Sequence, residues 1–154
     1  MTYFNALHPD SRVWIFQADR GLSERDKATI TAALNEFVPT WAAHGNALYG
    51  DFLLLNDYQI VVALDESKAG ASGCSIDSMT RVIQGLGSDL GIDFFQRMNV
   101  LLELNGKLEI KHFAQVSEDD REKMYYDNTI QSLSELNINW KKPATSGWLA
   151  TRFK

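Results

Sequence analysis

The sequence predicts an α+β protein with two layers, in which two main helices cover one face of an antiparallel sheet. Three observations support this fold class: strand-like and helix-like segments alternate, two apolar stripes have helical spacing, and an Asn-Gly pair separates two apolar runs. The chain has 154 residues, of which 45% are hydrophobic, and this is enough for one core. We therefore expect residues 1–154 to form a single α+β domain.

A strand and a helix are expected first. The strand is Arg12–Ala18, a run rich in β-branched and aromatic residues. Ser23, with Asp26 three residues later, resembles a capping box at the start of a helix. The apolar face of that helix has spacings of four, three and four residues and consists of Ile30, Leu34, Phe37 and Trp41. Because Pro39 falls inside this pattern, the helix should end near Val38 or kink there.

A hairpin and a second helix should follow. Asp51–Leu55 and Ile60–Leu64 are apolar runs separated by four residues of polar character, which is typical of a hairpin. The next helix should begin around Ser75 or Asp77 and end at Gly91, a common type of C-terminal cap. The apolar stripe of this helix consists of Ile76, Met79, Ile83, Leu86 and Leu90.

A second hairpin completes the order. Asn99–Leu104 and Lys107–Phe113 flank Asn105-Gly106, the strongest two-residue hairpin signal. The order βαββαβ is the ferredoxin-like arrangement, so we predict a ferredoxin-like two-layer sandwich with a mixed, aromatic-rich C-terminal extension. The aromatic residues of this extension should pack back onto the domain, because exposure would forfeit their burial; they are Trp140, Trp148 and Phe153.

Charge and composition argue against several classes of protein. The formal net charge of −5 is unlike the basic surface of a nucleic-acid-binding protein. No run approaches the eighteen or more apolar residues of a membrane-spanning helix, and the N-terminus lacks the pattern of a secretory signal. A single cysteine fits a reducing compartment. We therefore expect a cytoplasmic protein that binds neither nucleic acid nor membrane.

The segment Asp65–Asp77, DESKAGASGCSID, carries the candidate site. Its small residues lie between a predicted strand and a predicted helix, where backbone N–H groups can hold a phosphate or carboxylate. The leading interpretation is a small-molecule or anion site at the Cys74 loop, and its binding residues would be Asp65, Ser72, Gly73 and Ser75. The nucleotide-binding pattern GxxxxGK[ST] is absent, so we expect neither an ATPase nor a cofactor. The alternative is an ordinary glycine-containing loop.

The same loop contains the only cysteine of the chain, Cys74. The positive end of a helix dipole favours a thiolate, so a thiol-dependent enzyme is the second interpretation, with Cys74 as nucleophile and His44 as base. His112, expected on the inward face of its strand, is a second candidate base. Nearby carboxylates oppose thiolate formation, and Asp77 is well placed to cap a helix instead. In the remaining interpretation, Cys74 is a small buried hydrophobe in a tight turn.

Two further expectations concern metals and partners. The three histidines are far apart in the sequence and no CxxC pair exists, so no metal site is predicted. A third interpretation of the whole chain is a homodimerising interaction module that presents its sheet or its tail. Such a module should have an exposed apolar patch.

Four sequence elements resemble those of a family of small bacterial proteins of about this length. They are Trp14-Ile15-Phe16-Gln17, the W-x-x-H-G motif at 41–45, the D-E-S…A-S-G-C-S-I-D segment at 65–77, and the tail with Trp140 and Pro143. The resemblance covers most of the chain. Members often carry the label "ABC transporter ATPase", but this chain has neither a Walker A lysine motif nor an LSGGQ-like signature. The resemblance therefore implies a shared shape and loop, and no catalytic role.

Overall fold

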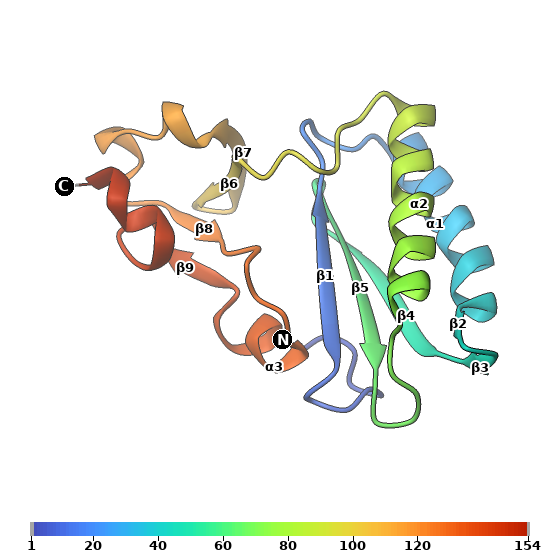
Figure 1. The fold of residues 1–154 in the computed structure, drawn as a ribbon. Coiled ribbons are helices and arrows are strands. Elements are labelled where there is room, and N and C mark those ends of the chain that lie inside the picture. The colour runs from blue at the N-terminus through green and yellow to red at the C-terminus, as the bar shows by residue number, and fades with distance from the viewer. Residues whose placement is uncertain (1, 154) are drawn as a thin grey trace.

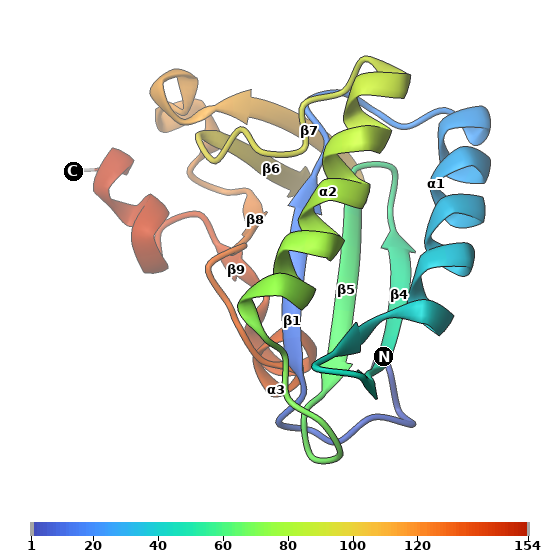
Figure 2. The ribbon, with the colours of Figure 1, turned by 45° about the vertical axis from the view of Figure 1, so that its right-hand side comes forward.

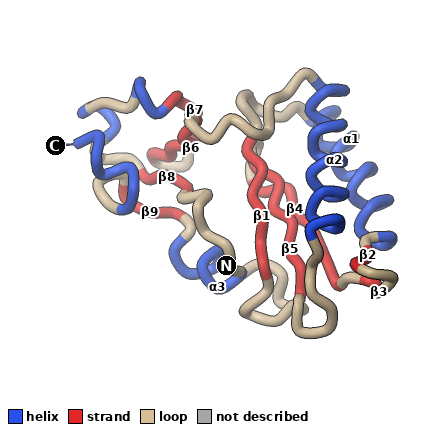
Figure 3. The backbone as a smooth tube through the Cα atoms, viewed as in Figure 1, coloured by secondary structure: helices blue, strands red, loops and turns tan. Residues whose placement is uncertain are grey.

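The structure is a computed structural model that describes residues 2–153, and it has an α+β architecture with three antiparallel sheets (Figures 1 and 3). The helices are α1 (Glu24–Phe37), α2 (Gly73–Leu90) and α3 (Leu133–Asn139), together with the 3₁₀ turns η1 (Val38–Thr40), η2 (Phe113–Gln115), η3 (Glu118–Asp120) and η4 (Gly147–Phe153). The strands are β1 (Arg12–Gln17), β2 (Ala42–Ala43), β3 (Asn46–Ala47), β4 (Tyr49–Leu55), β5 (Gln59–Asp65), β6 (Asn99–Leu104), β7 (Lys107–His112), β8 (Met124–Tyr126) and β9 (Lys141–Pro143).

The first sheet has the strand order β1-β5-β4 and is covered on both faces. Ile60, Val62 and Leu64 of the central strand pack toward α1 and α2, which lie side by side on one face (Figures 1 and 2). Val61 and Ala63 pack against α3 and the N-terminal segment on the opposite face. Because both faces are covered, every residue of β5 is buried. We call β1, β4, β5, α1 and α2 the N-terminal sandwich.

Both long helices begin and end at residues with clear local causes. Ser23 and Asp26 form a reciprocal capping box at the start of α1, as predicted. The helix ends at Phe37 and continues as η1, because Pro39 cannot continue the hydrogen-bond ladder. Helix α2 ends at Leu90, and Gly91 with φ +67° is its C-terminal cap, as predicted. The helix begins at Gly73, earlier than expected, because Ser72 provides the N-cap.

The second sheet has the order β7-β6-β8-β9, and with η2, η3 and η4 it forms what we call the C-terminal sheet region. The order β1-β5-β4 matches three strands of a ferredoxin-like sheet, but the ferredoxin-like topology is not shown, because β6 pairs with β7 and β8. The outer edge of β1 instead contacts a later segment: the Val13 N–H donates to the Gln131 carbonyl at 3.0 Å, and Arg12 forms a bridge with Ser132.

The aromatic tail packs back onto the protein, as predicted, but at two separate places. Trp140 belongs to the apolar cluster beneath the first sheet, with α3 and the N-terminal segment. Phe153 is buried in the cluster of the C-terminal sheet region, and Trp148 packs against the same cluster. Within residues 2–153, none of the helices has an apolar stretch of the length that a bilayer crossing requires.

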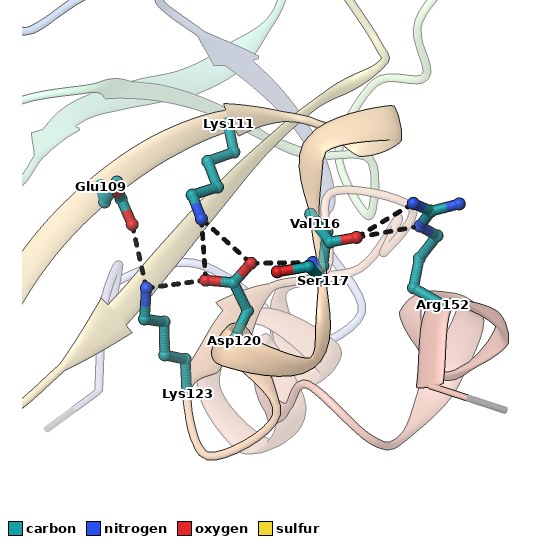
Figure 4. A network of polar contacts seen from close by, with 7 residues as sticks. All are labelled: Glu109, Lys111, Val116, Ser117, Asp120, Lys123 and Arg152. Atoms are coloured by element: carbon teal, nitrogen blue, oxygen red, sulfur yellow. Dashed lines mark hydrogen bonds and ion pairs between the residues drawn. The ribbon is translucent and has the colours of Figure 1, made fainter.

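A buried carboxylate joins the strands and turns of the C-terminal sheet region (Figure 4). The Asp120 side chain has no exposed surface, and it accepts hydrogen bonds from the ammonium groups of Lys111 and Lys123 and from the Ser117 N–H. Burial raises the pKa of Asp120, but the hydrogen bonds from Lys123, Ser117 and Lys111 outweigh burial, so its pKa is lowered. The contacts link β7, η3 and the residue before β8.

Candidate functional site

A surface pocket lies between the β2–β3 hairpin and the loop that follows β5. Its volume is about 440 Å³. We call it the His44–Lys68 pocket, and its lining residues are Ala43, His44, Asn46, Ala47, Tyr49, Lys68, Ala69 and Gly70. The pocket brings His44 next to the first half of the segment that the sequence indicated as the site, although the two are more than twenty residues apart in the chain.

The β2–β3 hairpin is held in place by Trp41. This residue is buried, and its indole Nε1–H donates to the Ser75 carbonyl at 2.8 Å, which attaches the hairpin to the first turn of α2. The ring also lies against Gly50, where a Cβ atom would come within 2.8 Å of it, so only glycine fits there. His44 and Gly45 both have positive φ angles and form the tip of the hairpin. The imidazole is therefore exposed.

The loop on the other side of the pocket is shaped by two carboxylates. Asp65 is buried and accepts from the Ser67 hydroxyl at 2.6 Å, the Ser67 N–H at 3.0 Å and the His8 N–H at 3.2 Å. The two bonds from Ser67 outweigh burial and lower the pKa of Asp65, with a further contribution from His8. The Glu66 carboxylate accepts from the Ala71 N–H at 2.9 Å. Asp65 therefore organises the loop and does not line the pocket.

Lys68 is the cationic residue of the pocket lining. Its Nζ atom lies 4.4 Å from the centre of the Tyr49 ring, within the range of a cation–π contact. No carboxylate lines the pocket, and among residues 2–153 no ion pair is formed by Lys68. His44 and Asn46 add side chains that can form hydrogen bonds. The pocket thus combines one positive charge with neutral polar groups.

The second half of the predicted site has a different arrangement. The Ser72 hydroxyl accepts from the Ser75 N–H at 3.1 Å, and the Ser75 hydroxyl accepts from the Ser72 N–H at 2.7 Å. These hydroxyl groups therefore form the N-terminal cap of α2. Gly73 and Cys74 follow the cap and are exposed. The interpretation of Cys74 as a buried small hydrophobe is wrong, because the first turn of α2 presents it to solvent.

The predicted residues are only partly brought together. His44 lines the pocket, whereas Asp65, Ser72, Gly73, Cys74 and Ser75 are not among its lining residues. His112 is at the end of β7, in the other sheet, and its Nδ1 accepts from the Ala114 N–H at 3.1 Å. Its expected inward orientation is wrong, since the side chain is exposed. No group of three or more histidine, cysteine or acidic residues suited to a metal ion occurs within residues 2–153.

Sequence reasoning missed Asn46, Tyr49 and Lys68 as pocket residues. Lys68 was inside the indicated segment, and its signal was that it is the only cationic residue there. Tyr49 carried no comparable signal, because an aromatic residue at the start of a strand is ordinary core material. Their contact requires β4 and the loop after β5 to lie side by side, and this follows from the pairing of Tyr49 with Asp65.

A second, smaller pocket of about 250 Å³ lies near α3 and is lined in part by Tyr3, Tyr126 and Trp140. Its amide groups already have partners within the protein. Asn137 accepts from the Tyr3 N–H at 2.7 Å and donates to the Tyr3 carbonyl, while Asn56 donates to Gln59. This pocket offers fewer free polar groups than the His44–Lys68 pocket.

Comparisons of the chain with protein-family models, with curated proteins and with solved structures gave no match.

Proposed function

We propose that the protein binds a small anionic molecule in the His44–Lys68 pocket. The observation that carries this proposal is Lys68, an ammonium group without a carboxylate partner in a pocket whose lining contains no acidic residue. In a chain of net charge −5, a surface lysine has many carboxylates available as partners. An unpaired lysine in a concave site is therefore a natural recognition group for an anion.

The other lining groups suit the same ligand class. The His44 imidazole and the Asn46 amide can donate hydrogen bonds to carboxylate or phosphate oxygens. The Tyr49 ring stabilises the ammonium group of Lys68 on one side and leaves its N–H groups to bind. A volume of about 440 Å³ is within the range of small-molecule sites, which run from roughly 300 to 1,000 Å³. We therefore infer a metabolite-sized anion rather than a macromolecule.

The test is a titration of the protein with a panel of small carboxylates and phosphates, followed by NMR chemical shifts and by calorimetry. For an anion that binds, Lys68→Gln should weaken binding about tenfold, since a charge-assisted hydrogen bond contributes roughly 1.5–3 kcal/mol. His44→Gln should weaken it less, because glutamine keeps a side-chain hydrogen-bond donor at this position. Raising the salt concentration should also weaken binding.

Two control variants make this experiment specific. Lys107→Gln removes the same charge from an exposed position on β7, outside the pocket, and should leave the affinity unchanged. Cys74→Ser should also leave it unchanged, whereas a thiol-dependent reaction at the same loop would be lost. Equal weakening by Lys68→Gln and Lys107→Gln, or no saturable shifts at all around the pocket, would refute the proposal.

A further inference from the structure

The smaller pocket near α3 differs in chemistry from the His44–Lys68 pocket. Its volume is about 250 Å³, and we call it the Tyr126–Trp140 pocket after two rings that form part of its wall. Most of the described residues that line it are aliphatic or aromatic: Tyr3, Leu55, Tyr126, Leu136, Ile138 and Trp140. They come from the N-terminal segment, the end of β4, β8 and the stretch from α3 to β9. A molecule in this pocket would therefore contact segments that are far apart in the sequence.

The polar side chains of this lining already have partners within the protein. The ammonium group of Lys141 pairs with the Glu103 carboxylate. The amides of Asn56 and Asn137 form hydrogen bonds to neighbouring residues. Among the described residues, the lining therefore presents no unpaired charge, in contrast to Lys68 in the other pocket. Such a lining favours a neutral ligand, because a charged group would lose water without gaining a partner.

Two aromatic rings of the wall are inclined to one another. The ring centroids of Tyr126 and Trp140 are 4.8 Å apart, and their planes make an angle of 66°. A third ring beside them can stack on one and point its edge at the other, and aromatic pairs prefer these two arrangements. The Trp140 indole is held in place, because it is buried and its Nε1–H donates to Asn128 at 3.0 Å. The wall is thus formed before a ligand binds, so binding costs little ordering entropy.

The size of the pocket fits a molecule with one ring and a small substituent. A cavity of about 150 Å³ can hold benzene, whereas the sites of drug-sized molecules begin near roughly 300 Å³. A volume of about 250 Å³ lies between these limits. Ile138, which also lines the pocket, has 82% of its surface exposed. A ligand would cover part of this side chain and so gain further apolar contact.

We propose that the Tyr126–Trp140 pocket is a second binding site, which takes a small neutral molecule with one aromatic ring. The proposal is independent of anion binding in the His44–Lys68 pocket, because the two pockets share no lining residue. An unpaired lysine lines one pocket, and aromatic rings without an unpaired charge line the other. The two sites should therefore differ in the charge of the molecules that they bind.

An NMR titration of the full chain with benzamide and benzoate tests this proposal. The two molecules have nearly the same shape, but only benzoate is charged at neutral pH. Benzamide should give saturable shifts of the Tyr126, Asn137 and Trp140 signals at roughly millimolar concentration, since a ligand of this size has few atoms that contribute affinity. Benzoate should bind there at least about fivefold more weakly, because its charge would be partly desolvated without a partner. Cyclohexanecarboxamide, which lacks the aromatic ring, should bind about threefold more weakly than benzamide.

Three variants locate the site. Tyr126→Leu removes one ring but keeps an apolar side chain on β8, and it should weaken benzamide binding about fivefold. Ile138→Ser changes an exposed position outside the core and should weaken binding about twofold. Phe95→Leu is the matched control: it removes a partly exposed ring outside both pockets and should leave the affinity unchanged. Circular dichroism checks that each variant is folded.

The proposal is overturned if benzamide causes no saturable shifts at these residues, or if benzoate or cyclohexanecarboxamide binds there as tightly as benzamide. Equal weakening by Phe95→Leu and Tyr126→Leu would overturn it as well, since benzamide would then bind exposed rings without selectivity. If Tyr126→Leu does not fold, Ile138→Ser and nuclear Overhauser contacts between benzamide and the Trp140 ring decide the question. An unchanged affinity of Ile138→Ser together with no such contacts would then reject the site.

Discussion

The N-terminal sandwich and the C-terminal sheet region are stabilised in different ways. In the sandwich, apolar side chains fill both faces of one sheet, and its central strand is buried from end to end. In the C-terminal sheet region, a smaller apolar cluster is combined with two buried carboxylates, Asp120 and Asp127. Asp127 accepts hydrogen bonds from Thr129 and Trp148 and pairs with Lys142.

This difference shows how a small region can be fixed when little apolar surface is available. Burial of apolar area is non-directional, so the stability of the sandwich depends on the volume that its side chains fill and not on particular pairs of groups. A buried carboxylate is costly unless every partner is in place, so it permits few alternative arrangements. We expect the sandwich to be sensitive to loss of volume and the C-terminal sheet region to be sensitive to loss of charge.

The largest expected effect comes from a cavity in the sandwich. Ile83 of α2 has no exposed surface and belongs to the cluster between the helices and the sheet. Ile83→Ala should lower the free energy of unfolding by about 4 kcal/mol, because the surrounding elements cannot collapse into the space. Urea denaturation measures this change, with exposed Gln84→Ala as the control. A loss below about 1 kcal/mol would show that the sandwich core is loosely packed.

A smaller effect is expected when the charge of the buried carboxylate is removed. Asp120→Asn should lower the free energy of unfolding by about 3 kcal/mol, because Lys111 loses its carboxylate partner and Lys123 keeps only Glu109. Denaturation in urea at pH 7 measures this change, and the neighbouring exposed Asp119→Asn is the matched control. Equal free energies of unfolding for Asp120→Asn and Asp119→Asn would show that the C-terminal sheet region does not depend on its buried carboxylate.

The free energy of unfolding of Asp120→Asn should also depend on pH less than that of the wild type. The pKa values of Asp120 and Asp127 are lowered, because hydrogen bonds outweigh the effect of burial. A lowered pKa in the folded state contributes stability above the ordinary value near 3.8, and this contribution is lost as the pH falls through the folded value. Between about pH 5 and pH 2, Asp120→Asn should therefore lose less stability than the wild type.

The smallest effect tests a local contact of the sandwich. Ser72→Ala removes the side-chain acceptor at the start of α2 and should cost about 1 kcal/mol. Ser78→Ala, on the same helix, removes a hydroxyl that donates to the Cys74 carbonyl and should cost less. Thermal unfolding of both variants makes the comparison. A cost at Ser72 comparable to that at Ile83 would mean that the cap, and not the core, controls this helix.

The elements of the sandwich were predictable because their causes are local. The spacing of Ile30 and Leu34 predicted α1, and Gly91 predicted the end of α2. In the C-terminal sheet region, the turn between β6 and β7 was predictable for the same reason, from Asn105-Gly106. The ferredoxin-like sheet was not predictable in the same way. Whether β6 pairs with β1 depends on whether another segment already occupies the edge of β1. The segment near Gln131 contacts this edge, and it lies more than a hundred residues later in the chain.

The candidate site was predictable in part for a related reason. His44 and the loop after β5 were both indicated, and the structure places them on one pocket. The roles within the loop were not predictable. Ser72 and Ser75 are suited both to binding an anion and to capping a helix, and only their mutual hydrogen bonds show that they form the cap.

By itself, the sequence determined the α+β class, the two long helices, the hairpin turns and the loop with its single cysteine, because propensity, periodicity and turn chemistry act over a few residues. Only the tertiary structure decided that β6 belongs to a second sheet, that Lys68 lies against Tyr49 beside His44, and that Asp120 is buried between two lysines. Each of these depends on contacts between distant segments. Such contacts form only when the gain from burial and pairing exceeds the entropy lost in joining them.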